Sequence, residues 1–206
     1  SGEAPKLRDM ILASTDIMGG LATKVAPVAN FALGLKPTKV VMDAVLKVDK
    51  HRTFPKYASR TFESWYKKNV KAFQDTFKRH VSFFHGCYVN YNYPQLGKDL
   101  ISVMNALGYG VHLLENEKCC GTALISNRMI DQAKKNAVNN VESIRKSVYE
   151  RQMPVIGTSS SCNFTIRDEY PHLLGIDNAD VRDYIELATR FIYRLIEEEK
   201  VKLVFR

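Results

Sequence analysis

The sequence lacks several features that would place the protein in a familiar class. Its 206 residues contain no uninterrupted apolar stretch of about 18 residues, so we expect no membrane-spanning helix. The first residues show no secretory signal pattern. No G-x-G-x-x-G follows a predicted strand, which argues against a nicotinamide or flavin fingerprint. We therefore expect no substrate-oxidising site and assign no catalytic residue.

Cysteine is scarce and unevenly placed. The chain has 4 cysteines, none of them in the first 80 residues: Cys87, Cys119, Cys120 and Cys162. No C-x-x-C pair is present, although zinc sites built from four cysteines usually use such pairs. In a chain without a secretion signal, grouped cysteines indicate a metal or redox site before a disulfide framework.

Negative charge is short in the first part of the chain. The formal net charge is +8, and residues 1–80 hold 15 Lys and Arg against 7 Asp and Glu. Residues 81–206 hold 15 of each, so the excess lies wholly in the first part. This shift predicts a boundary near position 80, with a helical basic segment over residues 1–79. Nothing supports nucleic acid as its partner, whereas an anionic membrane surface or an acidic partner protein fits.

The basic segment has two parts. Residues 6–35 mix apolar residues with Gly19, Gly20 and Pro27, which predicts short, broken helices. Residues 58–80 alternate aromatic with basic residues, a pattern that suits a helix lying on a membrane or a partner. The same aromatics could instead pack on the second part of the chain while the lysines face water, and we favour this interpretation.

Residues 80–206 alternate strand and helix patterns. Apolar strands are predicted at 80–87, 111–116 and 153–160, and helices at 94–110, 125–151 with Ser126 as N-cap, 162–170 and 181–200. Residues 201–206 could form an edge strand. The alternation predicts an α/β fold, with a Rossmann-like parallel sheet and helices on both faces, preceded by the mainly helical first segment.

Each cysteine follows the carboxyl end of a predicted strand. Because ligand sites in open α/β sheets form outside these ends, we expect all four thiols to meet at one point. Gly86, Gly121 and Gly157 flank them and would let backbone approach a bulky inorganic group. Adjacent cysteines seldom chelate one small ion, but they can reach different metal atoms of one iron–sulfur cluster. Inert core thiols are the alternative.

The spacing resembles the cysteine-rich CCG domain of heterodisulfide reductase and related iron–sulfur subunits. That family has one Cys, a gap, Cys-Cys-Gly, a similar gap and Cys-x-x-Cys. Here 31 intervening residues separate Cys87 in "FFHGCYVNYNYP" from Cys119-Cys120-Gly121, and "TSSSCNFTIRDEYP" supplies the last motif. Ser159 stands where the family has the first cysteine of Cys-x-x-Cys. It could ligate through oxygen, although capping a turn is the commoner role of such a serine.

The resemblance implies an iron–sulfur cluster held by Cys87, Cys119, Cys120 and Cys162, with Gly86, Gly121 and Ser159 as further cofactor contacts. Four thiolates favour [4Fe–4S] over [2Fe–2S] or a non-cubane cluster. It also implies an electron-transfer subunit between flavoprotein catalytic subunits and membrane quinone, peripheral on the cytoplasmic face of the plasma membrane. Whole subunits of this kind also carry a ferredoxin-like domain and a second CCG domain, so we expect this chain to be a middle part.

Two alternatives stay open. One is an assembly or membrane-docking module with a degraded cluster site, and the other is thiol–disulfide chemistry at Cys119-Cys120. Side chains near the cysteines also have two interpretations. We expect His85 to bond to backbone rather than ligate, and Arg167-Asp168-Glu169 to form a solvated helix face rather than a brace under the site. The tyrosines after Cys87 either shield the site or pack in the loop: Tyr88, Tyr91 and Tyr93.

Overall fold

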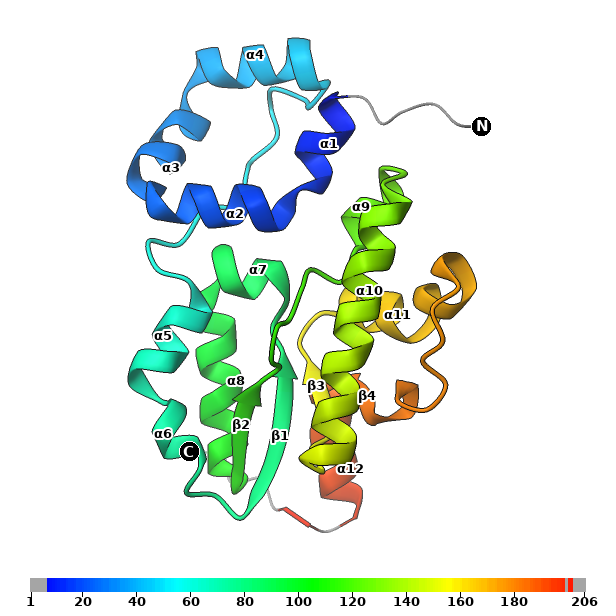
Figure 1. The fold of residues 1–206 in the computed structure, drawn as a ribbon. Helices are drawn as coiled ribbons and strands as arrows, with labels where there is room; N and C mark the ends of the chain where they lie inside the picture. The colour runs from blue at the N-terminus through cyan, green and yellow to red at the C-terminus, as the bar shows by residue number, and fades with distance from the viewer. Residues whose placement is uncertain (1–6, 199, 202–206) are drawn as a thin grey trace.

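The computed structural model describes residues 7–198 and 200–201. A parallel sheet is flanked by helices, and a group of helices from the first part of the chain lies across one end (Figure 1). The strands are β1 (Arg79–Phe84), β2 (Tyr109–Leu113), β3 (Val155–Gly157) and β4 (Ile185–Leu187). The α-helices are α1 (Leu7–Ala13), α2 (Thr15–Lys24), α3 (Ala26–Gly34), α4 (Lys36–Leu46), α5 (Phe62–Asn69), α6 (Lys71–Gln74), α7 (Gly86–Tyr91), α8 (Pro94–Ala106), α9 (Thr122–Ser126), α10 (Ile130–Arg145), α11 (Ser160–Phe164) and α12 (Ala188–Glu197). Two π-helical segments, η1 (Lys146–Glu150) and η2 (Thr165–Leu174), and a 3-10 turn, η3 (Arg182–Tyr184), complete the description.

The sheet has four parallel strands in the order β2-β1-β3-β4. From β1 the chain passes first to β2 on one side and later to β3 on the other. The order therefore reverses between β1 and β3. In open sheets of this kind the crevice outside the carboxyl ends at such a reversal is the usual ligand site.

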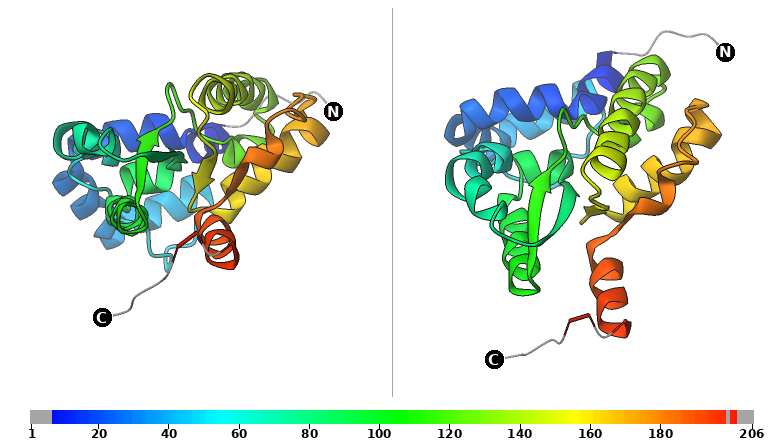
Figure 2. Two further views of the ribbon diagram at one scale, coloured as in Figure 1. Left: turned by 90° about the horizontal axis from the view of Figure 1, so that it is seen from below. Right: turned by 60° about the horizontal axis from the view of Figure 1, so that its bottom comes forward.

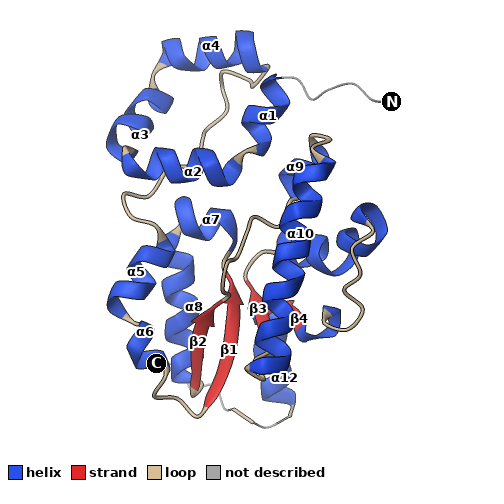
Figure 3. Cartoon of the chain, in the orientation of Figure 1, coloured by secondary structure: helices blue, strands red, loops and turns tan. Residues whose placement is uncertain are grey.

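Helices cover both faces of the sheet, as Figure 3 shows. Alternation along β1 places Val81 and Phe83 in one apolar core and Phe84 in the other. The first core includes side chains of α5, α8 and α12, and the second includes side chains of α10 and η2. The α/β class with a parallel sheet and helices on both faces is confirmed.

The aromatic stretch before β1 belongs to the first core. Phe62 and Tyr66 of α5 are buried against Phe83 and neighbouring residues, while Phe73 of α6 is exposed. The Tyr66 hydroxyl donates to the carbonyl of Val111 over 2.9 Å. The favoured interpretation, that these aromatics pack on the second part of the chain, is therefore confirmed for α5.

Helices α1–α4 bury little of their own apolar surface. They form an open ring beyond α7 and α9, seen from two further directions in Figure 2. α2 packs on α7 and α1 on α9, but α4 has no buried residue. Large apolar side chains remain exposed on this group: Met10, Ile17, Met18, Leu21, Val25, Val28, Phe31, Leu35, Val40, Val41 and Val45. In the described part of the chain, no helix is long and apolar enough to span a membrane.

Two predicted helices differ in the structure. The helix predicted over 125–151 begins only at Ile130, as α10. Ser126 is the last residue of α9 and does not cap α10, because Arg128, with a left-handed φ of 61°, separates the two helices. The predicted helix over 181–200 contains the edge strand β4 before α12 begins. The edge strand suggested at 201–206 falls almost wholly outside the described residues.

Candidate functional site

The four cysteines meet at the carboxyl edge of the sheet, around the reversal between β1 and β3. Cys87 lies in the first turn of α7 after β1, Cys119 and Cys120 in the loop between β2 and α9, and Cys162 in α11 after β3. All four are free thiols and are buried or half-buried. The sequence-based expectation that they converge is met by the geometry, while their role as ligands stays a prediction.

The thiols form a continuous row. The sulfurs of Cys120 and Cys162 lie 3.3 Å apart. The Cys119 thiol lies beside those of Cys120 and Cys87, and each of these pairs is close enough for one thiol to shift the pKa of the other. The row therefore runs from Cys87 through Cys119 and Cys120 to Cys162.

The four thiols shift one another's pKa values. Hydrogen bonds from Cys120 and Cys87 lower the pKa of Cys119, and a hydrogen bond from Cys120 lowers the pKa of Cys162. The same interaction with Cys119, together with burial, raises the pKa of Cys87 and of Cys120. The direction of the pKa shift therefore alternates along the row, because burial and neighbouring thiols oppose a charge on adjacent sulfurs.

Glycines allow the close approach at this edge. Gly86 has φ 70° and Gly121 has φ 95°, a region of backbone conformation that side chains rarely adopt. A Cβ at Gly86 would lie 3.5 Å from the Cys162 sulfur. The backbone at Gly86 therefore passes directly beside the row of thiols.

The first turn of α2 covers Cys119, which the sequence did not indicate. The backbone N–H of Cys119 donates to the Asp16 carboxylate over 2.9 Å, and the Thr15 hydroxyl lies 3.5 Å from the Cys119 sulfur. Burial, and secondly the charge of Cys119, raises the pKa of Asp16. These contacts span more than a hundred residues, so no local pattern could have revealed them.

Buried amides of α10 hold the Cys-Cys-Gly loop from the other side. Asn136 donates to the carbonyl of Cys119 over 3.1 Å. The Asn140 side chain accepts from the N–H of Lys118 over 2.8 Å and donates to its carbonyl over 3.0 Å. The Tyr170 hydroxyl donates to the carbonyl of Cys120 over 2.9 Å. Asn136 and Asn140 could have been identified from the sequence as polar residues on the buried face of a predicted amphipathic helix.

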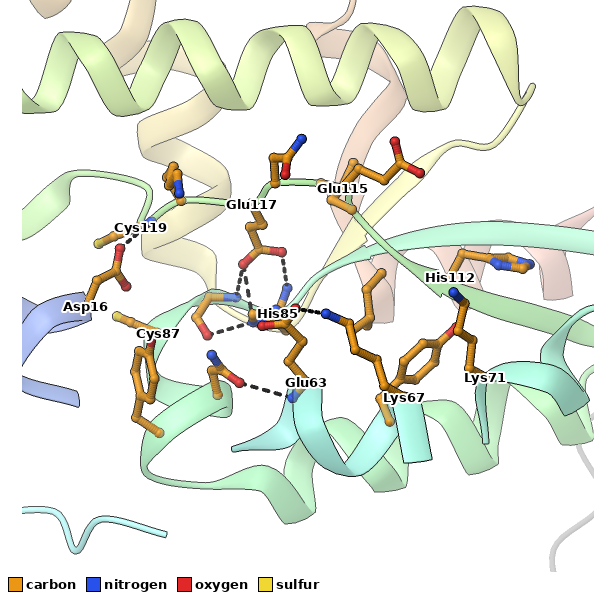
Figure 4. Close-up of a pocket in the computed structure, with 18 of the residues that line it drawn as sticks. Asp16, Glu63, Lys67, Lys71, His85, Cys87, His112, Glu115, Glu117 and Cys119 are labelled. Carbon is orange, nitrogen blue, oxygen red and sulfur yellow. Dashed lines mark hydrogen bonds and ion pairs between the residues drawn. The ribbon is translucent and has the colours of Figure 1, made fainter. Parts of the chain in front are cut away.

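A buried acid supports the turn before Cys87. The Glu117 carboxylate accepts from the backbone N–H groups of His85 over 3.1 Å and Gly86 over 2.7 Å, and lies 3.2 Å from His85 Nδ1 (Figure 4). Burial raises the pKa of Glu117 to about 7. His85 Nδ1 also lies 3.0 Å from the carbonyl of Gly86. The expected backbone bond of His85 is confirmed.

The remaining candidates near the site take structural positions. The Ser159 hydroxyl accepts from the N–H of Cys162 over 3.3 Å and caps α11. Tyr91 packs against Gly19 of α2, whereas Tyr88 and Tyr93 are about half exposed. Arg167 donates to the carbonyls of Arg182 and Ile185 over 2.6 and 2.7 Å. The expected solvated face is therefore wrong for Arg167, which braces η2 against the start of β4.

A cavity of about 980 Å³ opens beside the row. Cys87 and Cys119 lie at one end with Asp16, and Lys67, Lys71 and His112 line the other end, as Figure 4 shows. Cys120 and Cys162 do not line it. The cavity therefore adjoins the Cys87 and Cys119 end of the row and not the Cys120 and Cys162 end.

The donor set suits a cluster of several metal atoms. Within residues 7–198 and 200–201, no three His, Cys, Asp or Glu side chains are arranged to hold a single metal ion. The row instead offers four sulfurs, which are the ligands of iron–sulfur clusters. The buried amide of Asn163, next to Cys162, has no hydrogen-bond partner among the described residues and leaves a polar group free at this edge. The side chains at this edge of the sheet therefore fit an iron–sulfur cluster.

Residues 81–167 match the family model of the Cysteine-rich domain, CCG. The chain contains this domain, as its motifs indicated. Beyond the domain, the chain is similar to one of the subunits of the anaerobic glycerol-3-phosphate dehydrogenase of Escherichia coli, 54% identical over 196 residues that cover 95% of the chain and 49% of that protein. The chain thus spans about half the length of this relative.

More distant relatives match the CCG region. An uncharacterized iron-sulfur protein of Methanocaldococcus jannaschii is 30% identical over 112 residues, covering 54% of the chain and 22% of that protein. Lactate utilization protein A of Shouchella clausii is 29% identical over 130 residues, covering 60% of the chain and 52% of that protein. No solved structure matches the chain.

Proposed function

We propose that the chain is an iron–sulfur electron-transfer part of a glycerol-3-phosphate dehydrogenase complex in anaerobic respiration. A flavoprotein partner would oxidise glycerol 3-phosphate, and electrons would pass through this chain to membrane quinone. The observation that carries the proposal is the convergence of all four cysteines at the reversal of the sheet. The similarity to the Escherichia coli dehydrogenase protein supports the choice of substrate and partner.

Cys87, Cys119, Cys120 and Cys162 would hold the cluster, which supplies a reversible one-electron centre when bound. Gly86 and Gly121 leave room for it, and Ser159 orients the turn at Cys162. Asn136 and Tyr170 fix the carbonyls of Cys119 and Cys120, so the sulfurs need little rearrangement. α2 excludes water from Cys119 on the side of Thr15 and Asp16. Four thiolates favour a [4Fe–4S] cluster.

We further propose that the two parts of the chain have different functions. Residues 80–206 form the CCG domain, and residues 1–79 contact a membrane or a partner. The exposed apolar residues of α1–α4, together with the positive charge of this segment, support a surface that binds anionic lipid. Peripheral binding on the cytoplasmic face of the plasma membrane would bring the cysteines close to quinone.

The first test is iron and acid-labile sulfide content, with electron paramagnetic resonance, on the chain purified without oxygen. We expect near-stoichiometric iron and sulfide and a reducible signal that is lost in Cys119→Ser and Cys162→Ser. Ser161→Ala changes an exposed neighbour of Cys162 on the same helix and should keep the signal. Absence of iron after anaerobic reconstitution would refute the proposal.

The close approach of Cys120 and Cys162 favours thiol chemistry as a second candidate. A dithiol reductase, including one using Cys119-Cys120, would contain no iron and would react rapidly with alkylating agents. An assembly or docking module would bind anionic vesicles equally well with all four cysteines replaced by alanine. Iron analysis, alkylation and vesicle binding together separate the three functions.

A further inference from the structure

A second row of polar groups leads away from the site. The Thr122 hydroxyl lies 3.2 Å from the Cys120 sulfur and 2.7 Å from the Thr165 hydroxyl. The Thr165 hydroxyl in turn donates to the Glu169 carboxylate over 2.5 Å. Thr122 begins α9, whereas Thr165 and Glu169 are one helical turn apart in η2. Two segments that are remote in sequence thus join behind the Cys-Cys-Gly loop.

The hydrogens available to this row are too few for all of its contacts. When Cys120 is a ligand it has no proton, and an ionised Glu169 has none either. Three contacts then share the hydrogens of only two hydroxyls. Cys120 and Glu169 therefore compete for the hydrogen bonds of Thr122 and Thr165. When the hydroxyl hydrogens point toward the Cys120 sulfur, the Glu169 carboxylate loses a donor. When they point toward Glu169, the Cys120 sulfur loses one.

We propose that Thr122, held by Thr165 and Glu169, is a positioning residue that directs a hydrogen bond at the Cys120 sulfur and sets the reduction potential of the centre. This inference rests on the proposed function. A hydrogen bond to a ligating sulfur stabilises the more negative, reduced state, so it raises the potential. Glu169 opposes this effect because it draws the hydroxyl hydrogens away from the sulfur.

The proposal predicts opposite effects at the two ends of the row. Thr122→Val removes the donor and should lower the midpoint potential. Glu169→Gln replaces the carboxylate by an amide that can donate to Thr165, which frees both hydroxyls to turn toward Cys120. It should therefore raise the potential. Thr122→Ser keeps the hydroxyl and should retain the wild-type value.

The measurement is a redox titration followed by electron paramagnetic resonance, with iron content determined for each variant. In Thr165→Val, which breaks the row, adding Glu169→Gln should no longer raise the potential. If Thr122→Val does not fold, Glu169→Gln with and without Thr165→Val carries the test. Shifts of the same sign at both ends, or none, with iron retained, would overturn the inference alone. Iron-free wild-type protein would overturn the proposed function and this inference together.

Discussion

The Asp16 carboxylate accepts a hydrogen bond from the backbone of Cys119, 103 residues further along the chain, across 2.9 Å. This bond fixes the first turn of α2 on the Cys-Cys-Gly loop. It makes a helix of the basic segment part of the cysteine site, although that segment contains no cysteine.

Replacing Asp16 by alanine should loosen this loop. Loss of a hydrogen bond to a charged group costs about 1.5–3 kcal/mol, so the free energy of unfolding should fall by that order. Cys119 should also react faster with iodoacetamide. Urea denaturation and mass spectrometry of the alkylated chain measure both. Glu197→Ala, which removes an exposed acid of α12, is the control. Unchanged stability and alkylation would show that α2 does not hold the loop.

Acid should destabilise the protein through a histidine pair far from the thiols. His112 Nε2 lies 3.0 Å from His80 Nδ1, with Asp75 at 3.8 Å from His112 Nδ1. Burial, and secondly His80, lowers the pKa of His112, while Asp75 opposes and Arg151 and Lys71 add to the shift. In the pH window between the lowered pKa of His112 in the folded protein and 6.5, this histidine binds a proton more tightly in the unfolded chain. The free energy of unfolding therefore falls as pH drops through this window.

His112→Gln should remove part of this loss. The measurement is urea denaturation at two pH values, one above and one below the window, and the difference in unfolding free energy should be smaller in the variant. The exposed His172→Gln is the matched control and should behave like the wild type. Equal pH dependence in all three proteins would contradict the prediction.

Two glycine substitutions should have opposite effects on stability. Gly86→Ala places a Cβ on a backbone with φ 70°, beside the Cys162 sulfur, and should destabilise by about 1–2 kcal/mol. Gly20→Ala lies in α2 with no atom within 4 Å of the added Cβ, and should stabilise by roughly 0.5–1 kcal/mol. Thermal and urea denaturation give the sign of each change. A neutral Gly86→Ala would mean that the turn before Cys87 is not constrained.

The exposed face of α2 and α3 should bind lipid. Ile17 and Phe31 are 67% and 70% exposed, and each is worth roughly 1.5–3 kcal/mol when fully buried. The double variant Ile17→Asp/Phe31→Asp should lower affinity for phosphatidylglycerol vesicles at least tenfold in sedimentation assays. Tyr193→Asp, at an equally exposed aromatic of α12, should not. Failure of the wild type to bind, together with binding to a partner protein of the complex, would assign this face to protein contact.

Sequence patterns predicted the parallel sheet and the meeting of the thiols, because both follow from alternating periodicity and from the common edge of parallel strands. They missed β4, since Ile185–Leu187 continues the helical spacing of α12. They also missed Asp16 and Asn140, whose roles depend on which tertiary neighbour each side chain meets. Local periodicity thus accounts for the frame of the site, whereas its supporting hydrogen bonds depend on contacts between distant segments.

The placement of α2 has a consequence for the order of synthesis. Thr15 and Asp16 leave the ribosome long before the loop at Cys119, and Cys162 emerges later still. The α2 contacts with Cys119 can therefore form as soon as that loop emerges, whereas the Tyr170 contact with Cys120 must wait for η2. The cover of the Cys-Cys-Gly loop is therefore assembled in the order of synthesis, with α2 first, α10 next and Tyr170 of η2 last.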